Sequence, residues 1–594
     1  MSIWISPAIL PPEIEVLVRR WKLPTDRVDD VRALLAASAE GGTACALPPT
    51  APTKATSWGA ACQVIDDGTT KADASAIAPL VLRHHAGRPY LQSWRLFNAE
   101  QAIAREVLAR AQRSAPRLAR TADSLLADLG AAQVNERQSA AIRTGLEHTL
   151  AIIVGGPGTG KTHTLARLLA LLIADRPQDP PIIRLAAPTG KAADRMKEAV
   201  EAAADHLPST LPPETKGILK EVAASASTLH RLLGFNPSTG KCRVNAAAQL
   251  RSDVVIVDEC SMVDTLLWQA LLTALEPDTR LVLVGDPNQL ESISAGDVLG
   301  SLVRFARDHP RTALNDVCLE LTESQRFRDR PGIGSLAAAV VKSDANAAAT
   351  LLVNHQQSSG SGPPADGLGW LGDHTGAFAW ERLPASVQAA ITAVADAVSP
   401  SEALAALACV RLLTAHREYS LGARGINEAI HRHLLIRPGV KRAPNQPIIV
   451  NRNDPETGLT NGSVGIVMEV DGLHAAFFPS TAKNTPPRRV ALGQLPETSA
   501  AWALTIHRSQ GSEFDQVVVV LPKEDSPLAT RELIYTAITR ARQCVYVWGS
   551  ESTVRAALAE KAIRCTLLEA SLETLAPAKK PLVPQKITQF ELPL

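Results

Sequence analysis

Hydrophobic and polar residues alternate with two different periods along the chain. In residues 1 to about 120, apolar positions recur with helical spacing in EIEVLVRRW and again in EQAIAREVLARAQRSAPRLAR. From about residue 150 the pattern changes to short apolar runs, LAIIV, IIRLAA, VVIVDE and LVLVGD, which are separated by helical segments. Strands that alternate with helices in this way predict an α/β fold with a parallel sheet.

The second half of the chain contains a break and a smaller unit. Residues 355–375 are rich in Ser, Gly and Pro and are typical of a loop or linker. A helical stretch follows, and residues 441–500 then contain short alternating segments punctuated by Pro, Asn and Gly, which predicts a small barrel-like β unit. Two further strand-like runs, VVVVLP and YVWGS, indicate that the α/β pattern resumes after it.

Composition and charge narrow the class of protein. With 594 residues, of which 45% are apolar and 20% charged, the chain has the composition of a soluble globular protein of three or four units. Sixty-one Lys and Arg against 60 Asp and Glu leave a net charge of +1, so any surface for nucleic acid must be local. The aromatic residues (9 Trp, 4 Tyr and 9 Phe) are too few for extended base stacking, so phosphate contacts would have to dominate.

Cysteine usage and the N-terminal residues indicate a compartment. The eight cysteines are scattered without a CxxC pair or a Cys/His cluster, which argues against zinc or a disulfide framework and fits a reducing cytosol. The segment MSIWISPAILPPEIE lacks a basic n-region and a clean apolar core, and no window holds 18 uninterrupted apolar residues. We therefore expect a cytoplasmic protein with no membrane-spanning segment.

A phosphate-binding motif follows the first strand-like run. Residues 155–162 read GGPGTGKT, a complete G-x-x-x-x-G-K-[ST] between the run LAIIV and the helical THTLARLLALLIA. Glycines allow consecutive backbone N–H groups to wrap a phosphate, and the helix N-terminus adds positive potential. We expect Lys161 to reach the β and γ phosphates of ATP and the Thr162 hydroxyl to bind Mg²⁺. The loop itself consists of Gly155, Gly156, Pro157, Gly158, Thr159 and Gly160.

Carboxylates and an amide follow the next two strand-like runs. VVIVDECS places Asp258 where it could hold the Mg²⁺ shell, and Glu259 where it could orient or deprotonate the attacking water. LVLVGDPNQL places Gln289 just beyond a further strand, where a neutral amide could contact the γ phosphate. Together with Lys161, these residues predict hydrolysis as well as binding.

Transition-state charge must also be neutralised, and two arginines are candidates. Arg326 lies in ESQRFRD and Arg540 in YTAITRAR, although in isolation each is equally well explained as a surface arginine. Arg540 lies 379 residues beyond Lys161, too far for the same βα unit, so a site shared between two domains is the economical interpretation.

Eight motifs occur in an order that resembles a known family. They are GGPGTGKT, LAAPTGKAADRM, STLHRLLG, VVIVDECSMVD, LVGDPNQLESI, SQRF, WALTIHRSQGSEFD and ELIYTAITRAR. The series, over residues 132–550, is similar to that of superfamily one DNA helicases of the RecD-like branch. The length near 600 and the segment RPYLQSWRLFNAEQAIARE resemble the RecD (alpha) subunits of the RecBCD exodeoxyribonuclease V complex.

The resemblance implies an architecture. It implies two RecA-like P-loop domains with parallel sheets flanked by helices, a helical N-terminal domain, and an SH3-like β insertion in the second motor domain. The expected boundaries are residues 1–120 for a partner-docking domain, 121–325 for the first motor domain with a small insertion near 234–250, and 326–594 for the second, with the SH3-like insertion at about 441–500.

The resemblance also implies roles for individual residues. Gln138 would read the adenine edge, Glu513 would be a ribose or helix-capping group, and Arg326 and Arg540 would contact the γ phosphate across a cleft. ATP would close the cleft and hydrolysis would let it open. The residues implied to line the single-strand channel or the entry to the insertion are Thr189, Gly190, Thr228, His230, Asn461, Gly462, Thr505, His507 and Ser509.

Three positions depart from the family pattern. Gln325 replaces an aromatic residue that often precedes the arginine of SQRF, which removes adenine stacking there. His163 follows the P-loop threonine, and Cys260 follows the carboxylate pair, but neither has a catalytic role.

The function that follows is an ATP-dependent 5′→3′ DNA helicase or translocase. By resemblance it acts as the alpha subunit of a bacterial RecBCD-type helicase–nuclease in double-strand-break repair and homologous recombination. Its partners would be the 5′-ended single strand of a duplex end and RecB-like and RecC-like subunits in a heterotrimer, with nuclease activity on a partner subunit. The alternative is a stand-alone RecD-like helicase without those subunits.

Three other classes of function compete with this interpretation. A protein-remodelling ATPase would have no use for the TIHRSQG segment. A nuclease centred on Asp205, Glu214 and Lys216 lacks the preceding strand that such a site needs. A scaffold with a vestigial motor is disfavoured because the motif set is complete.

Overall fold

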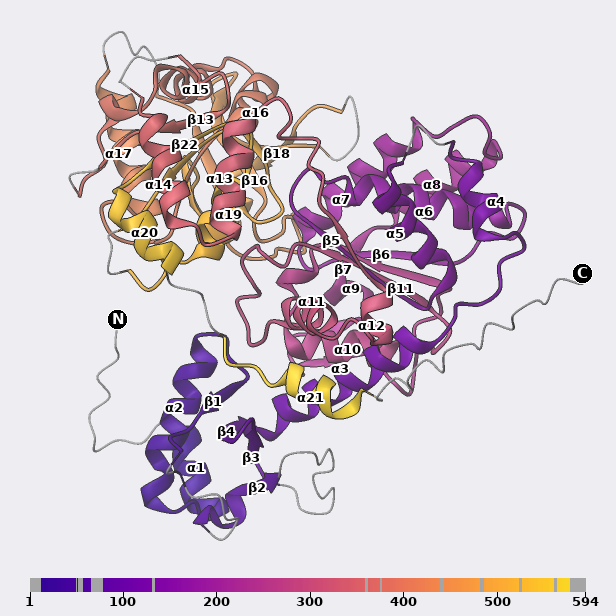
Figure 1. Ribbon diagram of the computed structural model, residues 1–594. Helices are drawn as coiled ribbons and strands as arrows, with labels where there is room; N and C mark the ends of the chain where they lie inside the picture. Colours follow the sequence, from indigo (N-terminus) through magenta and orange to yellow (C-terminus); the bar gives the residue numbers. More distant parts are fainter. Residues whose placement is uncertain are drawn as a thin grey trace, which may run out of the picture.

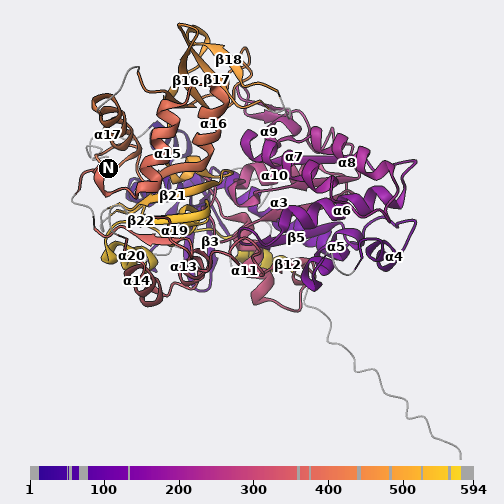
Figure 2. The same ribbon diagram turned by 90° about the horizontal axis from the view of Figure 1, so that it is seen from above.

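The computed structural model describes residues 12–49, 51, 57–65, 78–130, 134–357, 362–373, 376–437, 443–480, 485–522, 526–559 and 564–576. These residues form two parallel sheets, an antiparallel sheet beside the second of them, and a smaller N-terminal sheet (Figures 1 and 2). Residues 1–11, which include most of the N-terminal segment MSIWISPAILPPEIE, lie outside the described part of the chain. Among the described helices, none combines the length and apolarity needed to cross a bilayer.

The first α/β domain is built on a six-stranded sheet in which every neighbouring pair is parallel, with the order β12-β5-β11-β10-β6-β7. Its strands are β5 (Leu150–Gly155), β6 (Ile183–Ala187), β7 (Ser227–Thr228), β10 (Val254–Val257), β11 (Arg280–Gly285) and β12 (Cys318–Leu321). Its helices are α4 (Ala122–Ala127), α5 (Glu136–Glu147), α6 (Lys161–Asp175), α7 (Gly190–Ala204), α8 (Glu214–Ala224), α9 (Leu229–Leu232), α10 (Thr265–Ala274), α11 (Val298–Asp308) and α12 (Ala313–Asp316). A short hairpin, β8 (Phe235–Asn236) and β9 (Lys241–Cys242), lies where the small insertion was expected.

Strands β5 and β10 of this sheet are apolar at successive positions because both faces are covered. Val255 and Val257 pack into one hydrophobic core, whereas Val254 and Ile256 pack into another on the opposite face. Side chains alternate across a strand, so an unbroken apolar run is what a strand buried on both faces requires. The apolar runs from which the parallel sheet was predicted therefore reflect the burial of a strand on both of its faces.

The second α/β domain has a five-stranded, wholly parallel sheet with the order β13-β22-β21-β14-β20. Its strands are β13 (Leu368–Trp370), β14 (Val410–Thr414), β20 (Ala503–Thr505), β21 (Phe514–Val520) and β22 (Ala541–Trp548). Its helices are α13 (Pro331–Val341), α14 (Ala345–Asn354), α15 (Ala385–Asp396), α16 (Pro400–Cys409), α17 (Ala423–Ile436), α18 (Ile506–Ser509), α19 (Arg531–Ile538) and α20 (Glu551–Ala559).

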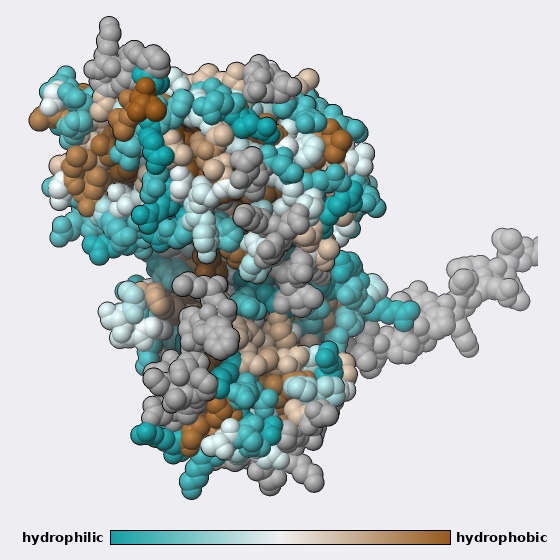
Figure 3. Space-filling model, turned by 90° about the vertical axis from the view of Figure 1, so that its left-hand side faces the viewer, coloured by the Kyte–Doolittle hydropathy of each residue, from teal (hydrophilic) through white to brown (hydrophobic). Residues whose placement is uncertain are grey.

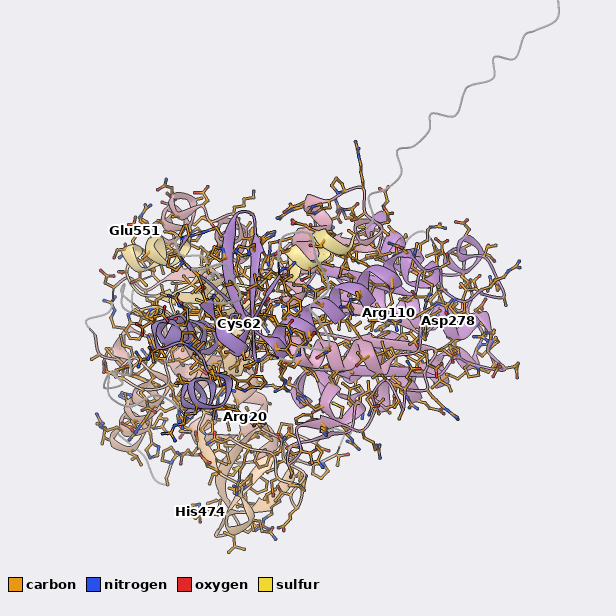
Figure 4. The ribbon with its side chains drawn as sticks, turned by 90° about the horizontal axis from the view of Figure 1, so that it is seen from below. Arg20, Cys62, Arg110, Asp278, His474 and Glu551 are labelled. Atoms are coloured by element: carbon orange, nitrogen blue, oxygen red, sulfur yellow. The ribbon has the colours of Figure 1, made fainter. Side chains whose placement is uncertain are left out.

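An antiparallel sheet is inserted between α17 and β20, in the region where a small β unit was predicted. Its order is β18-β17-β16-β15-β19, and its strands are β15 (Gln446–Val450), β16 (Val464–Val470), β17 (Leu473–Phe478), β18 (Arg488–Ala491) and β19 (Thr498–Ala500). Ile466 and Phe477 join the core of the second domain, which includes Trp548. The sheet projects from the body with His474 near its tip (Figures 2 and 4). Its likeness to an SH3 fold stays a prediction.

The N-terminal unit contains more than the helices that the sequence predicted. Besides α1 (Pro12–Trp21), α2 (Val28–Ala39) and α3 (Trp94–Gln112), it has a four-stranded sheet of β1 (Ala44–Ala46), β2 (Cys62–Ile65), β3 (Leu80–His85) and β4 (Arg88–Ser93). These strands were missed because they are only three to six residues long and because two of them, β3 and β4, end in polar residues, as in RPYLQS. The C-terminal half of α3 also joins the core of the first α/β domain, through Ile103 and Val107 among others.

The chain returns to the N-terminal unit at its C-terminal end. Helix α21 (Leu568–Leu575) packs against α3 and α11 and not against the second α/β domain that precedes it (Figure 1). This corrects the expectation that residues 326–594 form one unit. In Figure 3 the exposed face is mostly hydrophilic, and a constriction separates the upper body from the N-terminal unit below it.

Candidate nucleotide and nucleic-acid site

The phosphate loop connects the buried strand β5 to α6. Gly158 and Gly160 have φ values of 74° and 85°, which L-residues with side chains rarely adopt, and a Cβ at Gly158 would collide with Arg326. The Lys161 ammonium donates to the carbonyl oxygens of Gly155 at 2.5 Å and Gly156 at 2.9 Å. The Lys161 side chain therefore folds over the loop that should receive phosphate.

Gln138 lies against this loop at the start of α5. Its side chain accepts a hydrogen bond from the Asn135 N–H at 3.2 Å, while Asn135 accepts from the Gln138 N–H at 2.8 Å, a reciprocal capping box. The Gln138 amide nitrogen is the group that a Cβ at Gly160 would meet. The cap orients Gln138 beside the loop, and its contact with adenine stays a prediction.

The two carboxylates follow β10 at the same edge of the sheet. The Glu259 N–H donates to Asp258 Oδ1 at 2.8 Å, and Glu259 has a φ of 52°, a left-handed conformation that costs a non-glycine residue about 1–3 kcal/mol. Burial, together with the neighbouring Glu259, raises the pKa of Asp258 to about 6. A cation at this point would restore Asp258 to its charged form.

A chain of hydrogen bonds joins the two α/β domains beside the carboxylates. Arg540, which is buried, donates to Gln289 Oε1 at 2.6 Å, and Gln289 donates to Asp286 Oδ2 at 3.1 Å. The Tyr535 hydroxyl also donates to Asp286 Oδ2, at 3.0 Å. Because Arg540 and Tyr535 come from the second domain, Gln289 is held from both sides of the domain interface.

Glu513 is the centre of an arginine cluster. It forms ion pairs with Arg326 at 2.6 Å, with Arg542 at 3.3 Å and with Arg195, although only 9% of its side chain is exposed. Burial alone would raise the pKa of Glu513, but Arg195 and Arg326 outweigh it and hold the pKa at about 2. Its contacts are with guanidinium groups, so the structure does not place it as a helix cap.

Arg195 is a site residue that the sequence analysis missed. It lies on α7, within GKAADRM, and faces Glu513, Glu259 and Asp258. Charged residues in the first turns of a helix are usually solvated, so its side chain gave no signal of its own. The available clue was its place six residues after Thr189, in a motif already singled out.

These groups surround one cavity of about 500 Å³ at the interface of the two domains. Its lining includes the predicted residues Pro157, Gly158, Gly160, Lys161, Thr162, Asp258, Glu259, Gln289, Arg326, Glu513 and Arg540, together with Arg195.

The residues expected near DNA come from several elements of both α/β domains and of the insertion. Thr189 and Thr228 act as N-caps, accepting from the N–H groups of Ala192 and Arg231 at 3.2 Å each. His230 is exposed and stacks edge-on against Phe235 with 5.1 Å between ring centres. A Cβ at Gly190 would lie 3.2 Å from the hydroxyl of Thr460 in the antiparallel insertion.

The motif WALTIHRSQG contains one wrong assignment. Ser509 is fully buried and donates to the Ile506 carbonyl at 2.7 Å, so its hydroxyl holds the short helix α18 and is not available to DNA. Thr505 and His507 are partly exposed, and burial lowers the pKa of His507 below its usual value. Asn461 is exposed and lies next to Gly462 in the connection between β15 and β16 of the insertion.

The departures and the nuclease alternative have simple structural accounts. The Gln325 N–H donates to the Gly158 carbonyl at 2.9 Å and its side chain is exposed.

Asp205 pairs with Lys220 at 2.8 Å and Lys216 at 3.0 Å, which lowers its pKa to about 2. Within the described ranges, no group of three His, Cys, Asp or Glu residues is arranged to hold a metal ion.

Two RecA-like sheets, with a P-loop on one and an arginine from the other at a shared cavity, define the class of two-domain P-loop ATPases. Two family models match within these sheets: an AAA domain over residues 138–295 and a UvrD-like helicase C-terminal domain over residues 500–548. The chain is 39% identical over 449 residues to the RecBCD enzyme subunit RecD of Mycolicibacterium smegmatis, which covers 74% of this chain and 75% of that protein. The chain belongs to the RecD family of DNA helicases.

Two more distant similarities complete the comparison. An ATP-dependent RecD2 DNA helicase of Deinococcus radiodurans is 28% identical over 454 residues, covering 73% of this chain but 52% of that protein. Among solved structures, the Pif1 helicase from Candida albicans is 16% identical, with a TM-score of 0.40, and covers 71% of this chain and 96% of that one.

Proposed function

We propose that this chain is an ATP-driven 5′→3′ single-stranded DNA translocase that acts as the RecD-type subunit of a RecBCD-like heterotrimer. The observation that carries the motor part is the hydrogen bond from Arg540 of the second domain to Gln289 of the first, at the edge of the phosphate loop. A site completed by both domains can convert hydrolysis into domain movement.

The nucleotide would lie in the cavity with its phosphates on the loop from Gly155 to Thr162 and its base beside Gln138. Lys161 would leave the loop carbonyls for the β and γ phosphates. The Thr162 hydroxyl and the Asp258 carboxylate are hard oxygen donors of the kind that Mg²⁺ takes, so the residues present fit this ion. When bound, Mg²⁺ would neutralise phosphate charge.

Hydrolysis would use groups already oriented by the fold. Glu259, held at an unusual φ, would accept the proton of the attacking water, and Gln289 would position that water against the γ phosphate. Arg540 would stabilise the developing negative charge from the far side of the cleft, and Arg326, which lies beside the phosphate loop at Gly158, would do so from the near side. Arg195 is a third guanidinium close enough to share this task.

The single strand would run across both domains. Short polar residues at helix starts, such as Thr189 and Thr228, suit contacts to phosphates that are independent of sequence. Gly190 and Thr460 bring the first domain and the insertion to one point, beside Asn461. Thr505, His507 and His230 are the other accessible candidates.

The complex and its role rest on similarity to the relatives. The matched RecD proteins are named as RecBCD subunits, and the chain spans 75% of the M. smegmatis one but only 52% of the ATP-dependent RecD2 DNA helicase of D. radiodurans, which favours the subunit assignment. The N-terminal unit would then dock on a RecC-like subunit, in the bacterial cytoplasm, during double-strand-break repair. Nuclease activity would reside on a RecB-like partner.

ATP hydrolysis by the purified chain, with and without single-stranded DNA, tests the motor. We expect DNA to stimulate hydrolysis and Lys161→Gln to abolish it while the thermal unfolding curve is unchanged. Unstimulated hydrolysis would contradict the DNA motor, and DNA degradation by the chain alone would contradict the placement of the nuclease. Co-purification of the native protein distinguishes a subunit from a stand-alone enzyme.

A further inference from the structure

The last described segment of the chain is a strap between domains. We call residues 564–576 the C-terminal strap. Helix α20 of the second domain ends at Ala559, and the strap then lies along the N-terminal unit and the first α/β domain, where α21 packs on α3 and α11 (Figure 1). The strap therefore touches structure that is more than 250 residues away in sequence.

A buried carboxylate fastens the strap to the N-terminal unit. Glu100 of α3 is 1% exposed and accepts hydrogen bonds from the hydroxyls of Thr43 at 2.5 Å and Thr566 at 2.8 Å. The N–H groups of Thr43 and Ala44 both donate to the Cys565 carbonyl, at 2.9 and 3.1 Å. A buried charge with several donors is costly to disturb, so this end of the strap is firmly attached.

Arg564 extends from the strap into the loop that carries Gln289. Its guanidinium lies 2.7 Å from a carboxylate oxygen of Glu291, and it donates to the carbonyls of Ser294 at 3.0 Å and Gly296 at 3.1 Å. The exposed fractions of the two charged side chains are 17% and 15%. These three acceptors are held through Nε and Nη1 of one planar guanidinium, a rigid fork of donors that a lysine does not have.

The N-terminal unit reaches the same loop directly. The Gly296 N–H donates to the Gly41 carbonyl at 2.7 Å. Gly41 has a φ of +85°, and a Cβ there would lie 2.5 Å from the guanidinium carbon of Arg564. Only glycine allows the backbone of the N-terminal unit to lie this close to Arg564.

The loop from Asp286 to Asp297 is therefore held on three sides. Its first part is held by the second domain, because the Leu290 N–H donates to Thr536 at 2.8 Å and the Leu290 carbonyl accepts from Gln510 at 3.0 Å. Its later part is held by Arg564 and by Gly41. Leu290 alone separates Gln289 from Glu291, so a shift of the later part moves Gln289 as well.

We propose that Arg564 is a positioning residue that fixes this loop, and with it Gln289, to the N-terminal unit. The inference rests on the proposed role of Gln289. Arg564 does not line the nucleotide cavity, so it acts through the loop and not on the nucleotide.

The charges around Glu291 explain why an arginine is needed there. Burial raises the pKa of Glu291 to about 8, Asp297 adds to the rise, and Arg564 opposes it. Glu532 from α19 and Arg304 from α11 also face this carboxyl. Loss of Arg564 would leave Glu291 beside Asp297 and Glu532, with Arg304 and Arg531 as nearby positive charges, of which Arg531 pairs with Glu532 at 2.7 Å.

The test is steady-state ATP hydrolysis at saturating single-stranded DNA by Arg564→Ala. We expect kcat to fall about tenfold while the KM for ATP changes less than about twofold, because a displaced Gln289 affects the transition state more than nucleotide binding. The matched control is Arg437→Ala, since Arg437 also has 17% of its side chain exposed and an ion pair, with Asp396, but belongs to the second domain. An unchanged kcat in Arg564→Ala would overturn the inference.

Two further variants separate positioning from simple charge balance. Arg564→Ala combined with Glu291→Gln removes the unpaired acid but does not restore the contacts to the carbonyls of Ser294 and Gly296, so we expect kcat to stay low. Recovery to the wild-type kcat would show that Arg564 only neutralises Glu291. Gly41→Ala, which presses on Arg564 from the N-terminal unit, should lower kcat in the same way, and an unaltered kcat in a folded Gly41→Ala protein would also count against the coupling.

The outcome for the wild-type protein separates the two proposals. If the wild-type chain shows no DNA-stimulated hydrolysis, the proposed function fails before Arg564 is examined. If the wild-type chain is stimulated and Arg564→Ala matches it, only the present inference fails. Thermal unfolding of each variant identifies any loss of kcat that comes from loss of fold.

Discussion

Replacing Glu513 with Gln should weaken the interface between the two motor domains by a calculable amount. Its pKa falls from the ordinary 4.5 to about 2, a difference of about 2.5 units, and each unit corresponds to about 1.36 kcal/mol. The charged form of Glu513 therefore contributes about 3 kcal/mol to the folded state at pH 7. Because 9% of the side chain is exposed, solvent screening reduces this value little.

The pH dependence has a defined sign. A carboxyl whose pKa is lowered by folding stabilises the protein above its unfolded pKa of 4.5, and that contribution is lost as pH falls through about 2. Linkage gives roughly half of the pH 7 contribution at about pH 3. Glu513→Gln should thus differ most from the wild type at neutral pH and least in strong acid.

The assay is denaturant unfolding at pH 7 and at lower pH, followed with a probe in each motor domain because a chain of this size need not unfold in one step. Glu551→Gln is the matched control, since Glu551 pairs with Arg555 on the surface of α20, where both side chains are 41% exposed (Figure 4). Such surface pairs contribute about 0–1 kcal/mol. Equal unfolding free energies for the two variants at pH 7 would refute the reasoning.

Substitutions at three other positions test the hydrogen bonds of Arg540, Tyr535 and Arg110. Arg540→Ala should lower kcat for ATP hydrolysis by about 10³ at saturating DNA. Arg540→Lys should restore little of this kcat, because the hydrogen bond to Gln289 needs the guanidinium fork. A substantial recovery of kcat in Arg540→Lys would show that the positive charge alone is sufficient. Tyr535→Phe should cost about 1 kcal/mol of unfolding free energy by removing the hydrogen bond to Asp286, and a neutral effect in denaturant unfolding would show that the bond is not formed in solution. Arg110→Ala should lower the unfolding free energy by about 3 kcal/mol. This buried arginine donates to the carbonyls of Thr279 and Glu276 and attaches α3 to the first domain beside Asp278 (Figure 4). Amide hydrogen exchange in α3 should become faster, and an unchanged exchange rate would contradict this role of Arg110.

The sequence was most informative where a local pattern carries the chemistry. The P-loop follows from eight consecutive residues, and both parallel sheets follow from apolar runs buried on two faces. The interface between the two motor domains was predicted from sequence separation, because Arg540 is too far along the chain from Lys161 to belong to the same βα unit. In each case the signal lies within one short segment or in the order of several.

Contacts between distant segments could not be predicted in the same way. The role of Glu513 depends on Arg195 and Arg326, which lie 318 and 187 residues before it and carry no mark of that pairing. Ser509 lies in a motif that suggests DNA, but its burial is a property of the packed domain. The N-terminal strands were hidden because they are short and because β3 and β4 end in polar residues, so they lack a strict alternation.

The C-terminal strap has a consequence for how the protein is made. Glu100 is separated from Thr566 by 466 residues, so a ribosome moving at about 5–20 residues per second would need roughly 20–90 s to supply its last partners. During that time the nascent N-terminal unit would expose a carboxylate and the apolar face of α3 that α21 later covers. The N-terminal unit would therefore complete its packing only after the C-terminal strap is synthesised. Until then, chaperones or a docking subunit that arrives during translation could bind the exposed face of α3.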